Sequence, residues 1–299
     1  MGFFKTLFGG HEETAEEKAE SKQQYNFEVL TYDAVQAMQV GKVDYAIACL
    51  ERALTIRDND EETRYRLAQA YVQKDRLEEA AEQFESLCLL APDNAAYPLA
   101  LADLCFQQEQ YDEMEEACRR ALAIDDSLAM PHYLLAKRAF ARSEWAEAAD
   151  ECTAALNQKD DYAEARLLRA QSLKNANRLD EAMTDVERMV ADEQGTDEVL
   201  LLKAQILAAQ NRNDEAAEAY RASIELNPFV PAAYIELSAL LRNAGKNDEA
   251  QRVMDDAVEQ LGVSPDDAKV LQMGDGTSVE EYMRNAYNAL NPYQLSVKL

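Results

Sequence analysis

The sequence predicts an all-α fold, a right-handed superhelical solenoid in which each repeat contributes two helices joined by short turns. The main observation is a column of small residues that recurs every 34 positions, and a second column at the same spacing. The first column contains Ala34, Ala68, Ala102, Ala136, Ala170, Ala204 and Ser238. The second contains Ala46, Ala80, Met114, Ala148, Ala182, Ala216 and Ala250. A fixed period in this range is typical of a solenoid, in which each repeat buries its apolar side against its neighbours.

The residues that break helices fall in only two places within each period. Gly41 and Gly245 lie midway between two stretches of helical apolar periodicity, whereas prolines such as Pro92 and Pro228 lie where one repeat meets the next. None of them interrupts the interior of either stretch. Each repeat is therefore expected to run helix, turn, helix, turn.

The second repeat shows the helical pattern in detail. Its first stretch places Leu67, Ala68 and Tyr71 on one helix face, and its second places Ala80, Phe84 and Leu87 on another. These residues are spaced by three or four positions, as on one side of a helix. The alanines are expected where two helices cross closely, because a methyl side chain lets their backbones approach.

Residues 64–92 resemble the tetratricopeptide repeat family, whose signature is W-x2-L-G-x2-Y…A-x3-F…P at a period of 34. The residues at the signature positions are Arg64, Leu67, Ala68, Tyr71, Ala80, Phe84 and Pro92. Arginine stands at the tryptophan place and alanine at the glycine place. The resemblance covers residues 27–264 and is specific for the fold, whereas it says little about the ligand.

The register divides the chain into five parts. Seven repeats are expected at 27–60, 61–94, 95–128, 129–162, 163–196, 197–230 and 231–264. Residues 1–8 form a short amphipathic segment and residues 9–26 a charged linker, in which the polar stretch 9–24 is interpreted as a linker or a frayed helix. After the repeats, residues 265–290 are expected to form degenerate capping helices that cover the end of the stack, and residues 291–299 a C-terminal tail.

Composition excludes several classes of function. The chain of 299 residues carries 30 Lys plus Arg against 57 Asp plus Glu, a net charge of -27, so binding to nucleic acid is not expected. The N-terminus lacks the apolar core of a secretory signal, and no apolar run of membrane-spanning length occurs. We expect a cytoplasmic protein, peripheral to a membrane if residues 1–8 attach weakly to one.

No catalytic constellation is evident. The five cysteines, Cys49, Cys88, Cys105, Cys118 and Cys152, lie among apolar residues and are expected as reduced core residues. Adjacent acidic residues such as Glu115 and Glu116 point about 100° apart on a helix, so they are interpreted as a solvated face. The sequence predicts that the protein is not an enzyme, uses no cofactor and has no metal site.

The resemblance implies a site on the first helix of each repeat, because these helices line the concave groove of such arrays and the groove usually holds a peptide or helix of a partner. By repeat place, the expected groove residues are Met38, Tyr65, Gln69, Val72, Leu99, Asp103, Phe106, Tyr133, Lys137, Phe140, Leu167, Gln171, Leu201, Gln205 and Ile235. The apolar members gather in repeats two to four. The alternative interpretation is that half of these side chains pack against the adjacent first helix.

These features predict a non-catalytic scaffold or adaptor that binds an apolar or basic-apolar peptide or helix of another protein. The five-residue carboxylate clamp of chaperone-binding relatives has no match here. An alternative is a membrane-tethered regulatory subunit of a larger complex, because Phe3, Phe4, Leu7 and Phe8 would share one side of an N-terminal helix. A further alternative is self-association through the C-terminal tail, where apolar residues alternate with polar ones.

Overall fold

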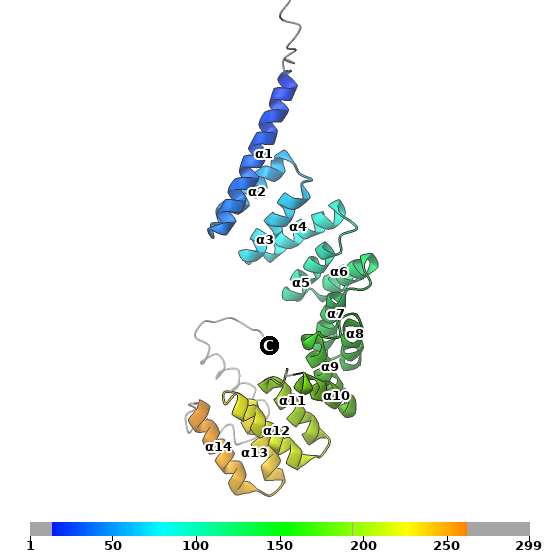
Figure 1. The fold of residues 1–299 in the computed structure, drawn as a ribbon, viewed down its shortest axis with the longest axis vertical. Coiled ribbons are helices and arrows are strands. Elements are labelled where there is room, and N and C mark those ends of the chain that lie inside the picture. Colours follow the sequence, from blue (N-terminus) through cyan, green and yellow to red (C-terminus); the bar gives the residue numbers. More distant parts are fainter. Residues whose placement is uncertain (1–13, 193, 262–299) are drawn as a thin grey trace, which may run out of the picture. The chain divides into compact units, whose positions relative to one another are not determined.

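The computed structural model describes residues 14–192 and 194–261, which form α-helices and turns with no strand in these ranges (Figure 1). The helices are α1 (Ala15–Gln39), α2 (Val43–Ile56), α3 (Glu61–Gln73), α4 (Leu77–Leu90), α5 (Ala96–Gln107), α6 (Tyr111–Ile124), α7 (Ala129–Ala141), α8 (Trp145–Gln158), α9 (Ala163–Asn175), α10 (Leu179–Ala191), α11 (Asp197–Ala209), α12 (Asn213–Leu226), α13 (Pro231–Asn243) and α14 (Asn247–Leu261). The chain divides after Arg138 into two compact units.

In the first unit each helix from α1 to α6 packs against the next one along the chain. The small-residue columns supply the packed positions: Ala68 and Ala102 on first helices and Ala80 on a second helix are each 0% exposed. Larger side chains fill the space around them, among them Leu50 and Leu87. The expected solenoid of helical repeats is confirmed here, with a core that runs along the unit rather than around one centre.

The second unit repeats this arrangement from α8 to α14, where each helix again packs against its successor. Ala148, Ala182 and Ala216 are 0% exposed, and Ser238 donates a hydrogen bond to the backbone oxygen of Ala250 on the paired helix (3.3 Å). All five cysteines of the chain are buried and free, as expected.

The turn within each repeat uses the left-handed backbone region. Gly41 and Gly245 have φ of +74° and +78°. At the same place in the five repeats between them stand Asp75, Glu109, Ser143, Asn177 and Asn211, with φ of 57° to 61°. The next residue then donates back to the helix, as Arg76 N–H does to the oxygen of Tyr71 (2.9 Å). This is the Schellman motif that ends a helix.

Of the two interpretations of residues 9–24, the structure has the helix rather than the linker from Ala15 onward, because α1 begins there. Thr14 accepts a hydrogen bond from Glu17 N–H (3.2 Å), and the Glu17 side chain accepts from Thr14 N–H (2.6 Å). This capping box, with Glu16 in the first turn, satisfies the exposed amides and makes the polar stretch helical. The N-terminal segment, the capping helices at 265–290 and the tail at 291–299 lie outside the described residues.

Candidate functional site

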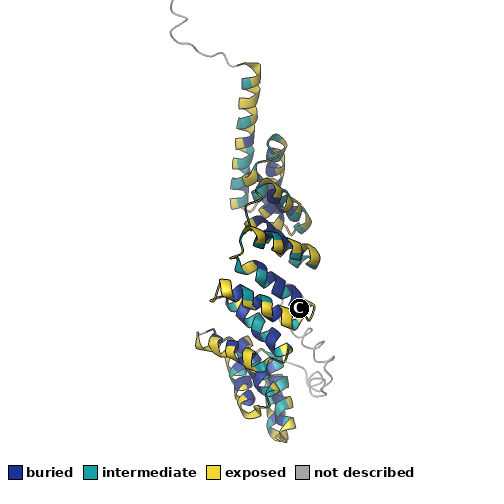
Figure 2. Ribbon diagram, turned by 90° about the vertical axis from the view of Figure 1, so that its right-hand side faces the viewer, coloured by how far each residue is buried: buried dark blue, intermediate teal, exposed yellow. Residues whose placement is uncertain are grey.

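The expected groove residues lie on the first helices of the repeats, at positions four and three residues apart such as Tyr65, Gln69 and Val72. All fifteen are half-buried or exposed, whereas the alanine column beside them is buried. The side of each first helix that carries them is called the first-helix face below. Figure 2 shows this alternation of burial around the helices. Their role in binding a partner stays a prediction.

Aromatic side chains connect α3, α4 and α5 at this face. The Tyr65 ring lies 6.1 Å from that of Phe84 on the paired helix, edge to face, and 6.0 Å from that of Tyr97 on α5. Tyr97 is buried, and its hydroxyl donates to a carboxylate oxygen of Glu61. Tyr65 therefore helps to hold two repeats together and presents only part of its ring.

A lysine lies over the aromatic rings farther along the first unit. The ammonium nitrogen of Lys137 on α7 is 3.9 Å from the ring centre of Phe106 on α5 and 5.7 Å from that of Tyr133. Phe106 in turn meets Tyr111 edge to face at 6.2 Å. Burial lowers the pKa of Lys137, and the carboxylate of Asp103 acts in the opposite direction. This cation–π contact joins two repeats and gives the face an apolar centre with one positive charge.

Packing against the core takes up part of the predicted set. Met38, Tyr65, Leu99 and Phe106 are partly buried against the core of the first unit, and Leu167 and Leu201 against that of the second. Val72, at 40% exposure, and the exposed Gln69 extend farther into solvent. The face in the first unit thus combines anchored rings with accessible side chains at its edge.

In the second unit the same face also carries polar contacts between repeats. Lys174 Nζ donates to Gln205 Oε1 (2.7 Å), and Gln205 Nε2 donates to Glu236 Oε1 (3.0 Å), which connects α9, α11 and α13. The Tyr220 hydroxyl completes the chain with a bond to the other oxygen of Glu236 (2.9 Å). The predicted groove residue Gln171 similarly donates to Glu198 (3.0 Å). Gln171 and Gln205 are therefore engaged in contacts between repeats.

The predicted aromatic run does not stay within one unit. Phe140 belongs to the second unit, where its ring lies 5.0 Å from that of Trp145 in an edge-to-face contact. Tyr65, Leu99, Phe106, Tyr133 and Lys137 belong to the first. Within the first unit, the structure brings Phe106, Tyr133 and Lys137 together, and this cluster is the centre of the candidate site described below.

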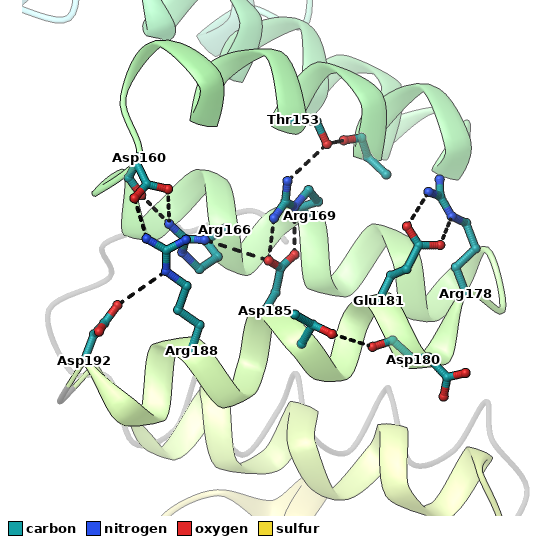
Figure 3. A network of polar contacts seen from close by, with 12 residues as sticks. Thr153, Asp160, Arg166, Arg169, Arg178, Asp180, Glu181, Asp185, Arg188 and Asp192 are labelled. Carbon is teal, nitrogen blue, oxygen red and sulfur yellow. Dashed lines mark hydrogen bonds and ion pairs between the residues drawn. The ribbon is translucent and has the colours of Figure 1, made fainter.

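Sequence reasoning missed a buried ion-pair network in the second unit. Asp185 on α10 is 3% exposed and accepts two hydrogen bonds from Arg169 on α9, at 2.7 and 2.5 Å. Arg166, also buried, lies 3.9 Å from Asp185 and bonds to the backbone oxygen of Asp160 (Figure 3). Arg188 donates to Asp160 from the opposite side. These contacts join the end of α8 to α9 and α10.

The sequence does contain a signal for this network, because arginine replaces the tryptophan of the tetratricopeptide repeat signature in two repeats. Arg64 and Arg166 both stand there, three repeats apart. Arg64 donates to the Gln83 side chain (2.8 Å) and to the backbone oxygen of Asp58, and these two residues are the repeat equivalents of Asp185 and Asp160. An arginine at this place thus hydrogen bonds with the turn before its helix. The interpretation of Glu115 as solvated is also wrong, because its side chain pairs with the buried Arg138.

Within residues 14–192 and 194–261, no group of three His, Cys, Asp or Glu side chains is placed to hold a metal ion. Over the same residues, every helix is too short or too polar to cross a bilayer.

Three family models of the tetratricopeptide repeat match the chain, one at residues 37–97 and 139–206, one at 99–127 and one at 201–268. Together they cover most of the array. The chain is a tetratricopeptide repeat protein. Among curated protein sequences, the search returned no match. Membership in this family supports a protein-interaction scaffold as the general class of function.

Solved structures agree on the fold at low sequence identity. A tetratricopeptide repeat protein from Parabacteroides merdae is 14% identical, with a TM-score of 0.59, and the match covers 83% of this chain and 97% of that one. The C-terminal part of a repeat protein from Cytophaga hutchinsonii is 13% identical, with a TM-score of 0.64, and the match covers 79% of this chain and 97% of that one. YrrB, described as a TPR protein with an unusual peptide-binding site, is 17% identical, with a TM-score of 0.55. The match covers 67% of this chain and 98% of that one. At these identities the likeness concerns the fold alone.

Proposed function

We propose that this tetratricopeptide repeat protein is a non-catalytic scaffold that binds an amphipathic helix or an apolar peptide of another protein on the first-helix face of its first unit. The observation that carries the proposal is the cluster of Phe106, Tyr133 and Lys137, which lies half-buried on this face. Exposed side chains on the same face include Val72 and Asp103. Aromatic residues surrounded by polar groups are the usual centres of binding energy in protein interfaces.

The arrangement favours a partner with one apolar side. Rings that are already held by Tyr111 and Lys137 lose little conformational freedom when a partner covers them, and this lowers the cost of binding. A net charge of -27 should attract basic segments that flank the apolar side and should speed their encounter at low salt.

The test uses a matched pair of surface variants in one repeat. Val72→Asp places a charge on the first-helix face, whereas Leu89→Asp places one on the second helix, where Leu89 is 77% exposed. Proteins captured from a lysate by the wild type are identified by mass spectrometry, and one of them is then purified. The Val72→Asp variant is expected to bind it at least tenfold more weakly, with helical circular dichroism unchanged. Equal weakening by Leu89→Asp, or by neither change, would contradict the proposal.

A further inference from the structure

Helix α1 carries an apolar side that faces solvent. Tyr25, Val29, Tyr32, Gln36 and Val40 are spaced by three or four residues and share this side, called the α1 outer face. The exposed fractions of Tyr25, Tyr32 and Val40 are 66%, 65% and 67%. The opposite side holds Phe27, Ala34 and Ala37, which are buried.

The equivalent positions in later repeats are covered. The place of Val29, which is 36% exposed, is taken by Thr63 and Tyr97 in the first unit, at 1% and 7% exposure. In the second unit the same place holds Ala165, Val199 and Ala233, all at 1% or less. In each of these repeats the preceding second helix packs against the first helix. Among the described residues no second helix precedes α1, so this surface, which is built for packing, is open.

We infer that residues 1–8 of the same chain, MGFFKTLF, dock on the α1 outer face and take the place of the missing second helix. Phe3, Phe4, Leu7 and Phe8 supply apolar side chains that match Val29 and Tyr32 in kind. Lys5 is positive, and Glu28 and Asp33 flank the face with negative charge. A basic, apolar segment therefore fits this surface in both polarity and charge.

The length of the connection permits the docking. Six residue steps separate Phe8 from Thr14, which an extended chain covers with about 20 Å. Thr14 to Val29 spans about 22 Å along a helix that rises about 1.5 Å per residue. Phe8 can therefore lie close to Val29, with the residues before it beside Tyr32 and Gln36.

Two features of α1 favour that register over others. The stretch from Ala15 to Gln24 (AEEKAESKQQ) contains no apolar side chain larger than alanine, so it offers the segment nothing to pack against. At the far end of the outer face, Gln36 and Val40 border a cavity of about 480 Å³ that Tyr45 also lines. This volume accommodates aromatic rings, and Phe3 or Phe4 can reach it when the chain is extended.

The first test places a fluorescent reporter in the segment. Trp145 is the only tryptophan of the chain, so Phe4→Trp in a Trp145→Phe background reports on one site. Its emission is expected at short wavelength, with weak quenching by acrylamide. Adding Val29→Asp and Tyr32→Asp should shift it to the wavelength of an indole in water, whereas adding Leu89→Asp should not.

The second test needs no tryptophan background, in case Trp145→Phe impairs folding. Deletion of residues 1–8 is expected to increase nitration of Tyr25 and Tyr32 by tetranitromethane several-fold, with nitration of the half-buried Tyr111 on α6 as the internal reference for reagent activity. Water-like emission of the parent reporter, or unchanged nitration, overturns the inference. A short-wavelength emission that grows with protein concentration also overturns it, because the occupant would then be a second copy of the chain.

Discussion

Arg169 and Asp185 form a two-armed ion pair inside the second unit, with Arg169 Nε and Nη2 donating to the two carboxylate oxygens of Asp185. Thr153 accepts a further bond from Arg169 Nη1 (3.2 Å). Because Asp185 is 3% exposed, its charge depends on this pairing rather than on water. The helices α9 and α10 are thereby joined by a contact that tolerates little displacement.

Breaking this pair should destabilise the protein more than replacing it. Arg169→Met or Asp185→Leu alone leaves a buried charge without its main partner and should lower the free energy of unfolding by about 3–5 kcal/mol. The double variant removes both charges and should lose much less. Urea unfolding of all four proteins measures the coupling, and additive losses would contradict it. Arg178→Met breaks an exposed pair with Glu181 and serves as the control, with a cost below about 1 kcal/mol.

Replacing a turn residue of positive φ with glycine should increase the stability of the protein. Glu109 has φ of +59°, a conformation in which a side chain costs about 1–2 kcal/mol relative to glycine. Glu109→Gly removes that cost, and the greater freedom of glycine in the unfolded chain offsets part of the gain. We expect a net increase of about 0.5–1 kcal/mol in the free energy of unfolding.

The reverse substitution at the first turn is the matched control. Gly41 has φ of +74°, and a Cβ added there would meet no atom within 4 Å. Gly41→Ala should therefore lower stability by about 1 kcal/mol through backbone strain alone. Melting curves of both variants measure the difference. A loss in Glu109→Gly would show that its side chain has contacts that outweigh the strain.

Alkaline pH should unfold the protein through its buried tyrosines. Burial, and then a hydrogen bond to Glu61, raise the pKa of Tyr97 to about 12. Burial and a hydrogen bond to Glu51 raise the pKa of Tyr71 to about 12 as well. In the unfolded chain a tyrosine ionises near pH 10. The stabilisation that these two tyrosines give the folded state is therefore complete below about pH 10. It is lost as pH rises towards about 12, because the tyrosines of the unfolded chain release their protons at lower pH than those of the folded chain.

Tyr97→Phe separates this effect from general alkaline damage. The variant should lose about 1 kcal/mol at neutral pH with its hydrogen bond to Glu61, yet its stability should fall less steeply between pH 10 and 12. Urea unfolding at several pH values measures both quantities. Tyr32→Phe, at an exposed position, should leave the slope unchanged. Parallel pH profiles for all three proteins would disprove the assignment.

Enlarging a column alanine should overpack a helix crossing. Ala148 is 0% exposed, so Ala148→Leu should cost about 1–3 kcal/mol, whereas Ala123→Leu at an exposed position should be nearly neutral. A melting temperature that is the same for both variants would contradict the repeat register.

Repetition made the fold predictable from the sequence. A residue such as Ala80 carries little information alone, but six further positions at the same spacing show that the environment recurs. The same argument placed Val72 and Phe106 on one face of the first helices. What repetition could not show is how far each ring is already engaged. The contact between Lys137 and Phe106, and the bond between Lys174 and Gln205, each join residues of different repeats and depend on side-chain conformations that no periodic pattern specifies.

Features that occur once were missed for the same reason. Asp185 has cysteine, glutamine, alanine or valine at most of its equivalent places, so its burial could not be inferred from the column. Between Ala15 and Gln24 the sequence could not distinguish a helix from a linker, because the composition of this stretch is polar and charged. Only the pairing of Thr14 with Glu17 indicated where it begins.

The N-terminal part of α1 has a mechanical consequence. From Ala15 to Asn26 it contributes no buried side chain, so its helical state rests on a cap and on local pairs, which are marginal in water. Its amide protons should exchange quickly with solvent while those near Ala34 are protected. Unwinding these twelve residues would lengthen them from about 18 Å to about 40 Å. The first half of α1 is thus an extensible spacer, and its length is set by how many of its residues are coiled.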